Sequence, residues 1–225
     1  MITEKSLSLE EMVYTNLEEE ILSGKLTRGT SLGEISISLR LGVSRTPVRG
    51  ALHRLSEDGL VEILPNRGAV VLGINSEDLI DIYHIRMRLE GLASASAAER
   101  ISEEDLTKLS DAVELAEFYI NKKDTEHLKE LDTQFHSIIY RASGNRLLNK
   151  VLSELHRKTK AYRKLSLSVP GRLEKSAFEH REILMAIKER NPEKADRLTS
   201  LHVERALENM LSSNTKQILK FKVKT

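Results

Sequence analysis

The stretch LRLGVSRTPVRGAL, residues 39–52, is the most informative about the fold of the first part of the chain. Leu41-Gly42-Val43 predicts a tight turn, and Ser44 is a residue type that commonly caps the start of a helix. Pro47 falls in the first turn of that helix, where its missing N–H is harmless. Apolar residues then recur at helical spacing, at positions 48, 51, 52 and 55. The stretch therefore predicts the turn and second helix of a helix-turn-helix.

The flanking residues extend this motif in both directions. Helical patterns cover residues 10–23 and 32–39 before the turn. After the third helix, the apolar runs 60–64 and 69–72 are separated by Pro65-Asn66-Arg67-Gly68, which predicts a hairpin. Residues 1–74 are thus expected to form a winged helix-turn-helix domain of three helices and a two-stranded wing.

The charge pattern of this region suggests a polyanionic partner. No acidic residue lies between Glu34 and Glu57, whereas four arginines do, at positions 40, 45, 49 and 54. Arg45 and Arg49 share a helix flank with His53, away from the apolar stripe. Arginines there can reach guanine edges or phosphates, and a helix N-terminus bearing Ser44 and Thr46 can accept a phosphate. The alternative is that the arginines only form a solvated surface.

From Ser76 onward the pattern is helical almost without interruption. Turns are predicted near residues 101–102, 123–124, 143–145, 170–171 and 191–192. The fold class is therefore mainly α, with about six helices of roughly 17–25 residues forming an antiparallel bundle over residues 75–212. Residues 213–225 are basic and weakly patterned, and a frayed tail is expected there.

The composition excludes several classes of protein. The 225 residues include no cysteine and no tryptophan, so disulfides and thiolate metal sites are ruled out. The net charge is +1, and the N-terminus lacks the apolar core of a signal peptide. No uncharged apolar run is long enough to cross a membrane. A cytoplasmic location without a membrane partner is expected.

One basic residue of the second part falls on an apolar stripe. Arg86 takes a core position in the series Leu79, Ile82, Leu89 and Ala93. A guanidinium inside a bundle needs an anionic partner. Two interpretations remain open: a structural ion pair, for instance with Glu90, or an anchor for the carboxylate of a ligand.

Four further polar residues point to a metal site. Asp132 and His136 stand at i and i+4 on one helix. His180 and His202 interrupt two apolar stripes, and each lies eleven residues from Asn191, at the predicted turn. In an antiparallel helix hairpin, equal distance from the turn brings residues together. One carboxylate and three imidazoles suit Zn²⁺, Ni²⁺, Mn²⁺ or Fe²⁺. The remaining histidines are expected at the surface: His53, His84, His127 and His156.

The first part resembles the DNA-binding domain of the GntR family of bacterial repressors. The resemblance rests on ILSGKL at 21–26, on residues 39–52 quoted above and on LSEDGLV at 55–61. The chain departs from the family by having Arg28-Gly29 in place of Pro-Gly, and Gly50 in place of glutamate. The resemblance implies that the wing enters the minor groove, which makes Arg67 and Gly68 candidate contacts. The candidate DNA-binding residues are Arg40, Ser44, Arg45, Thr46, Arg49, Arg67 and Gly68.

The second part resembles the all-helical effector domain, of the FCD type, in the FadR-like branch of that family. The similar segments are YHIRMRLE at 83–90, DTQFH at 132–136 with ASGN at 142–145, and EHREI at 179–183 followed by His202. The resemblance implies a divalent metal on Asp132, His136, His180 and His202, together with a small carboxylate effector. Arg86 and Asn209 are the candidate effector-binding residues.

These features predict a homodimeric transcriptional regulator, a repressor that binds double-stranded operator DNA and responds to an organic acid held at a metal. Two-fold symmetry follows from the need for two recognition helices on one operator. One alternative is a metal sensor, in which the ion itself is the signal. Another is a metal-dependent enzyme in the helical part, although no general base stands beside the four ligands.

Overall fold

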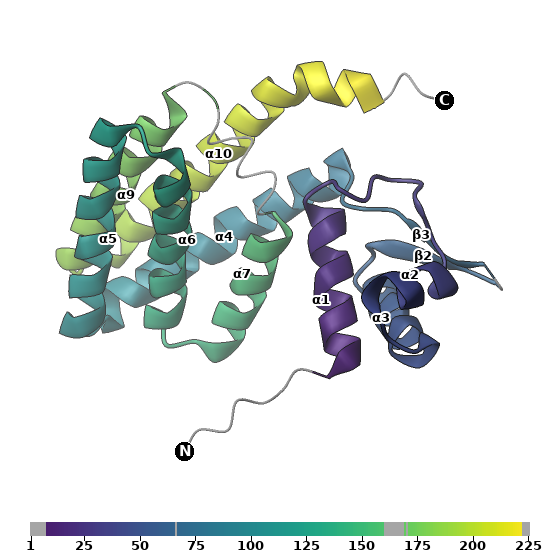
Figure 1. Cartoon of the computed structure of the whole chain (residues 1–225). Helices are drawn as coiled ribbons and strands as arrows, with labels where there is room; N and C mark the ends of the chain where they lie inside the picture. The colour runs from purple at the N-terminus through teal and green to yellow at the C-terminus, as the bar shows by residue number, and fades with distance from the viewer. Residues whose placement is uncertain (1–7, 66, 160–168, 170, 222–225) are drawn as a thin grey trace. The chain divides into compact units, whose positions relative to one another are not determined.

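The computed structural model describes residues 8–65, 67–159, 169 and 171–221, with the backbone alone given for residues 76 and 213–221. The chain divides between Asp78 and Leu79 into two compact units. The first is called the winged unit and the second the helical unit, and each is considered by itself (Figure 1).

The winged unit contains the predicted helix-turn-helix. Its helices are α1 (Leu9–Leu22), α2 (Glu34–Leu41) and α3 (Arg45–Glu57). Ser8 caps α1 by accepting a hydrogen bond from the backbone N–H of Glu11 at 3.1 Å. Gly42 ends α2 in the left-handed conformation, with φ of +66°, which glycine adopts without steric cost. Ser44 precedes α3 as predicted, but its side chain makes no capping hydrogen bond.

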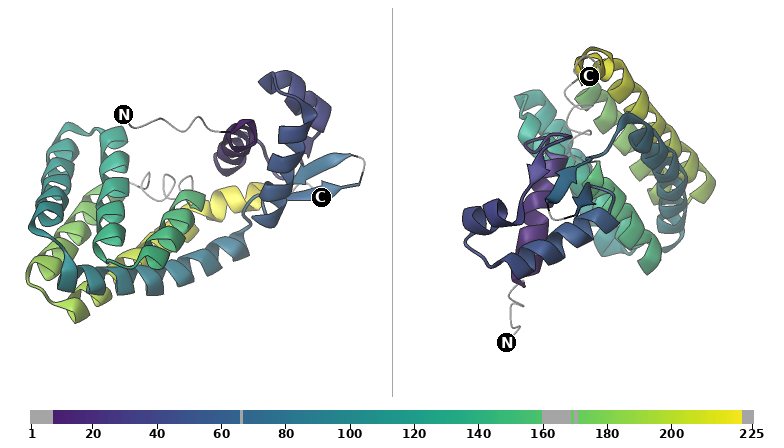
Figure 2. Two further views of the ribbon diagram at one scale, coloured as in Figure 1. Left: turned by 90° about the horizontal axis from the view of Figure 1, so that it is seen from below. Right: turned by 90° about the vertical axis from the view of Figure 1, so that its right-hand side faces the viewer.

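The two predicted strands of the wing are present, and a third short strand extends their sheet. Strands β2 (Val61–Leu64) and β3 (Gly68–Val71) form the expected antiparallel hairpin, which extends from the helices of this unit (Figure 2). A short strand, β1 (Ser31–Leu32), pairs with the other edge of β3, giving the order β1-β3-β2. Because residues 31 and 32 are engaged in this pairing, α2 begins at Glu34 and not at Leu32.

The core of the winged unit is built from the predicted stripe of α3 and from α1. Val48, Ala51, Leu52 and Leu55 are at most 1% exposed and pack with Val13 and Leu17 of α1. Burial of the valine and leucine side chains stabilises the unit by about 1.5–3 kcal/mol each. The opposite flank of α3 stays exposed, so Arg45, Arg49 and His53 face solvent.

In the described residues, the helical unit consists of six helices. They are α4 (Ser76–Arg100), α5 (Glu103–Lys122), α6 (Thr125–Ala142), α7 (Arg146–Lys158), α9 (Arg172–Lys188) and α10 (Pro192–Phe221). Helices α5 and α6 pack against each other, as do α9 and α10, and α5 also packs on α9 (Figure 1). The breaks near 101–102, 123–124, 143–145 and 191–192 fall where they were predicted, whereas Pro170 lies outside the described residues.

Two length predictions for the helical unit were wrong. Helix α7 has 13 residues and α10 has 30, whereas roughly 17–25 were predicted for each helix. Helix α10 includes residues 213–221, which belong to the segment predicted as a frayed tail. Residues 222–225 of that predicted tail lie outside the described part of the chain. No helix among the described residues is long and apolar enough to cross a membrane.

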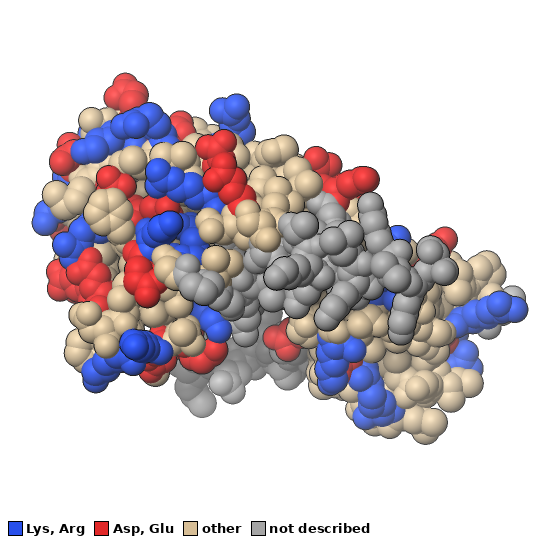
Figure 3. All heavy atoms as spheres, turned by 90° about the horizontal axis from the view of Figure 1, so that it is seen from above, with Lys and Arg blue, Asp and Glu red and all other residues tan. Residues whose placement is uncertain are grey.

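Figure 3 shows the charged side chains on one face of the molecule. Acidic and basic side chains are interspersed over the helical unit at the left, whereas most of the visible charged side chains of the winged unit at the right are basic. This agrees with the absence of acidic residues between Glu34 and Glu57.

Candidate functional site

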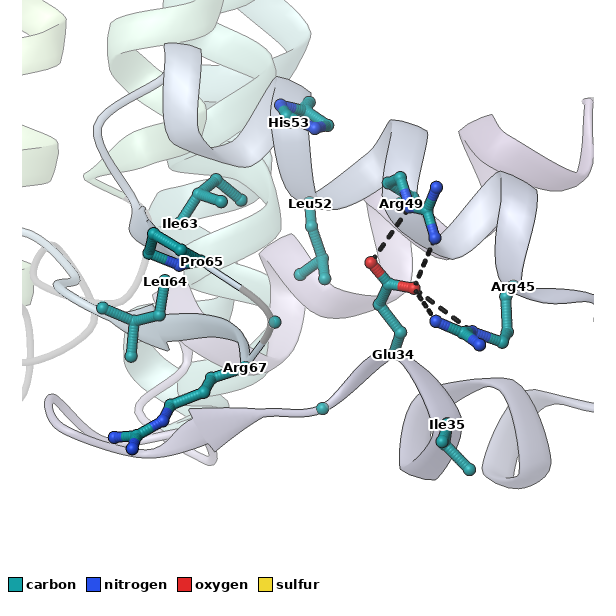
Figure 4. A pocket seen from close by; sticks show the side chains of 12 residues that line it. Glu34, Ile35, Arg45, Arg49, Leu52, His53, Ile63, Leu64, Pro65 and Arg67 are labelled. Carbon is teal, nitrogen blue, oxygen red and sulfur yellow. Dashed lines mark hydrogen bonds and ion pairs between the residues drawn. The ribbon is translucent and has the colours of Figure 1, made fainter.

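A groove between α2, α3 and the wing collects most of the predicted DNA contacts. It has a volume of about 590 Å³, and its lining includes Glu34, Arg45, Arg49, His53, Arg67 and Gly68. Figure 4 shows Arg45 and Arg49 converging on Glu34, with Arg67 standing apart on the wing. Ser44 and Thr46 are exposed at the start of α3. The groove thus brings two arginines of α3 and the wing cation Arg67 to one face of the winged unit.

Two of the predicted DNA contacts have intramolecular roles as well. Arg40 donates to both carboxylate oxygens of Glu20 on α1, at 2.9 and 2.7 Å, so it ties α2 to α1. Gly68 has a φ of +85°, and a Cβ there would overlap the backbone carbonyl oxygen of Leu32 on β1. Gly68 is therefore needed for the wing to close against β1, independently of any approach to DNA.

The helical unit brings together the four residues predicted to bind a metal. One ligand atom each from Asp132, His136, His180 and His202 lies within 4.8 Å of all the others. The Nε2 atoms of His180 and His202 are 3.4 Å apart. The two residues therefore lie side by side, as their equal distance from Asn191 predicted. Asp132 Oδ1 lies 3.8 Å from His180 Nε2 and 4.0 Å from His136 Nε2. Three helices supply the cluster: α6, α9 and α10.

Two buried carboxylates lie beside two of these imidazoles, and the contact of Glu179 with His202 is a hydrogen bond. His136 Nδ1 lies 3.1 Å from Glu90 Oε2, and His202 Nδ1 lies 2.7 Å from Glu179 Oε2. With Nδ1 on a carboxylate, Nε2 of each ring is directed into the cluster, an arrangement common at metal sites. The third ring, His180, is stacked on Phe135, with centroids 4.0 Å apart. The donor set therefore fits a divalent metal.

The protonation state of His202 suits a metal ligand. Burial lowers the pKa of His202 below its ordinary value, and this outweighs the hydrogen bond with Glu179, which acts in the opposite direction. Burial acts to raise the pKa of Glu179, but its hydrogen bond with His202 and the charge of Arg172 outweigh it and lower the pKa. A neutral imidazole beside an ionised carboxylate is the state that binds a metal.

Each of these two carboxylates is also paired with a buried arginine. Arg86 Nε donates to Glu90 at 2.7 Å, and Arg172 Nη1 donates to Glu179 at 2.8 Å. Both arginines are 2% exposed. Arg86 also donates to Thr159 Oγ1 at 3.2 Å and lies over the ring of Tyr83. Of the two interpretations of Arg86, the structure therefore shows the ion pair with Glu90.

A small cavity adjoins the cluster. It has a volume of about 20 Å³ and is lined by Asp132, His180 and Ser176, among others. That is room for one water-sized ligand. Ser176 Oγ is buried and has no hydrogen-bond partner among the described residues, as is true of Arg172 Nε. Polar groups of this kind are rare in cores and mark places where a bound water or ligand atom would be stabilised.

The remaining predictions for the helical unit had mixed outcomes. Asn209, a candidate effector residue, donates to the backbone carbonyl of Arg205 one turn earlier on α10. His53, His84 and His127 are exposed as expected. The placement of His156 at the surface was wrong: it is 7% exposed and its Nδ1 lies 3.2 Å from the Tyr140 hydroxyl.

Several residues of these sites were missed by the sequence analysis. Glu179, Arg172 and Ser176 carried no prediction, although the spacing of seven between Arg172 and Glu179 places both on one face of a helix. Glu34 was noted only as the border of a basic segment. Its pairing with two arginines eleven and fifteen residues away has no signature in the local pattern.

Comparisons with known proteins identify both units. Residues 9–71 match the family described as bacterial regulatory proteins, gntR family, and residues 81–205 match the FCD domain. The chain is 30% identical over 199 residues to the uncharacterized HTH-type transcriptional regulator YdhC of Bacillus subtilis, covering 88% of each chain. It is 26% identical over 200 residues to the transcriptional repressor RspR of Escherichia coli, covering 89% of this chain and 88% of that one.

A solved structure shows the same fold. E. coli McbR/YncC superposes with a TM-score of 0.73 at 24% identity, over 92% of this chain and 99% of the other. The matched families and relatives are transcriptional regulators and not enzymes, so the enzyme alternative is set aside. On this evidence the chain belongs to the GntR family of bacterial regulatory proteins, carries an FCD domain, and is a transcriptional regulator.

Proposed function

We propose that this regulator is a homodimeric repressor whose affinity for operator DNA is changed by a small carboxylate bound at a divalent metal in the helical unit. The proposal rests on the convergence of Asp132, His136, His180 and His202, two of which lie beside buried carboxylates. Named relatives support the repressor role, since RspR and the gluconate operon repressor of Bacillus subtilis are repressors.

DNA binding is assigned to α3 and the wing. Arg45 and Arg49 are 57% and 58% exposed and project from successive turns of α3 into the groove. Arginine is the residue type that most often reads guanine in the major groove. Ser44 and Thr46 would contact phosphate at the helix start, and Arg67 would enter the minor groove.

Asp132, His136, His180 and His202 would hold the metal, which would act as a Lewis acid for a carboxylate oxygen of the effector. The cavity beside Asp132 and His180 has room for one oxygen atom at the cluster, and Ser176 can donate to an oxygen placed there. Arg86 and Asn209 remain candidates for the effector. Because Arg86 is paired with Glu90, an effector carboxylate would have to share or replace that ion pair.

The test of the metal site is elemental analysis of the purified chain. We expect about one divalent ion per chain in the wild type, and its loss in His202→Ala, because no neighbouring group can replace a missing ligand imidazole. His84→Ala is the matched control, since His84 is exposed on α4. Equal metal content in His202→Ala and His84→Ala would eliminate the site.

The test of the DNA site uses duplexes selected by the wild-type chain from a random pool. Arg49→Ala should weaken binding by about 1–3 kcal/mol if the arginine contacts a base. Arg197→Ala removes the same charge from an exposed position of α10 and should have little effect.

The signal is tested by measuring the affinity for the selected duplex with metal alone and with metal plus a panel of small carboxylates. A change in affinity with metal alone indicates a metal sensor, and a change that requires a carboxylate indicates an effector-dependent regulator.

A further inference from the structure

Glu34 holds both arginines of the recognition helix. It is the first residue of α2, and its Oε2 accepts from Arg45 Nη2 at 2.9 Å and from Arg49 Nη2 at 3.1 Å. Its Oε1 accepts from Arg49 Nε at 3.1 Å. A single carboxylate thus bridges two successive turns of α3 from the neighbouring helix (Figure 4).

The bridge is charged and leaves the arginines accessible. Hydrogen bonds from Arg49 and then Arg45 lower the pKa of Glu34 from 4.5 to about 2, so the carboxylate is ionised at neutral pH. The three side chains together carry one net positive charge where the arginines alone would carry two. The arginine side chains remain more than half exposed, while that of Glu34 is 19% exposed.

We propose that Glu34 is a specificity-determining residue of DNA binding: it fixes the orientation of Arg45 and Arg49 and cancels one of their charges, which disfavours binding to DNA of arbitrary sequence. This inference rests on the proposed assignment of α3 as the recognition helix. Glu34 would thus have a function on the surface that binds DNA, although its own charge is negative.

The physical basis is the difference between phosphate and base contacts. Binding to any sequence is driven by release of counterions from phosphates and rises with each available cation. An arginine that is not held in place can contribute to such binding by contacting any nearby phosphate. Reading a base edge instead requires a planar guanidinium held in one orientation, and hydrogen bonds from Glu34 restrict both guanidinium groups in that way.

The decisive variant is Glu34→Gln, with Glu57→Gln as the matched control. Both remove one negative charge from α2 or α3, but Glu57 is exposed at the far end of α3 and has no part in the bridge. Binding is measured by fluorescence anisotropy over a series of KCl concentrations. The probes are the duplex selected by the wild type and a shuffled duplex of the same composition.

For Glu34→Gln we expect tighter binding to the shuffled duplex and a steeper salt dependence. One additional phosphate contact increases the slope of log K against log salt by about 0.9, which corresponds to about eightfold tighter binding at 0.1 M salt. Affinity for the selected duplex should rise less, so the ratio of the two affinities falls. Glu57→Gln should keep the wild-type ratio.

A second variant separates orientation from charge. Glu34→Asp keeps the negative charge but shortens the side chain by one methylene, so it cannot reach both arginines in the same way. The salt slope should stay near that of the wild type, while the preference for the selected duplex decreases. This variant also keeps the test informative if Glu34→Gln is poorly folded, which thermal melting would reveal.

The outcomes distinguish this inference from the proposed function. If Arg45→Ala and Arg49→Ala bind DNA like the wild type, the recognition helix is wrongly assigned and the inference falls with it. If those variants lose binding but both Glu34 variants match Glu57→Gln in slope and ratio, the recognition helix stands and the role of Glu34 is overturned.

Discussion

Replacing Arg86 by methionine tests whether the ion pair with Glu90 supports the helical unit. Arg86 and Glu90 side chains are 3% and 0% exposed, and their charged atoms are 2.7 Å apart. Burial acts to raise the pKa of Glu90, but the charge of Arg86 and then that of His136 outweigh it, so that pKa lies well below its ordinary value. Arg86→Met would leave this ionised carboxylate without its main partner.

The expected loss of stability is large. Breaking a buried pair by removing one partner costs about 3–5 kcal/mol, because the other charge is left uncompensated. A change of 1 kcal/mol shifts Tm by about 2–4 °C for chains of 150–250 residues, which is close to the size of this unit. Arg86→Met should therefore lower the Tm of the helical unit by about 6–20 °C.

The assay is thermal unfolding followed by circular dichroism, with a chelator present so that bound metal does not contribute. Arg86→Met/Glu90→Gln should recover much of the loss, since replacing both charges leaves no stranded one. Arg88→Met is the control, because Arg88 is exposed on the same helix. The reasoning is refuted if Arg86→Met melts at the same temperature as Arg88→Met.

Two further predictions concern the winged unit. Gly68→Ala should destabilise it by more than about 1 kcal/mol, because φ is +85° and the new Cβ would overlap the Leu32 carbonyl; an unchanged melting temperature for this unit would contradict the packing of β1 on β3. The Glu34 carboxyl should titrate near pH 2, so its ion pairs stabilise the fold above about pH 4.5 and this contribution is lost as the pH falls towards 2. Carboxyl NMR checks this, and in Arg45→Ala/Arg49→Ala the pKa should return towards 4.5, whereas a value near 2 there would show that the arginines are not the cause.

Features set by local periodicity were predictable from the sequence. The stripe of α3 and the breaks between helices depend on residues three or four apart, and the same applies to Arg86 as a core residue. The meeting of His180 and His202 was also predictable, because a helix hairpin converts distance from its turn into proximity. His156 could have been placed correctly, since it continues the buried series Leu148 and Leu152 at spacings of four.

Features that depend on distant residues were not predictable in this way. Strand β1 has two residues, and its partners Val70 and Ala69 lie nearly forty positions away, so no alternation reveals it. Glu34 on α2 pairs with arginines of α3, and Glu179 on α9 contacts His202 and Arg205 of α10. Both sets of contacts depend on the packing of separate helices, which periodicity does not describe. Gly50 is a further case: a Cβ there would overlap the side chain of Glu10 on α1, a contact visible only once both helices are placed.

The pairing of each buried arginine with a carboxylate has an electrostatic consequence for the order of ligand binding. Arg86, Arg172 and Arg205 supply three positive charges, which match the three negative charges of Glu90, Glu179 and Asp132. Counting the histidines as neutral, the charges around the cluster balance before any ion is bound. A divalent ion at the cluster would leave an excess charge of +2, and a carboxylate would reduce this excess. We therefore expect the affinity for any carboxylate to increase once the ion is bound.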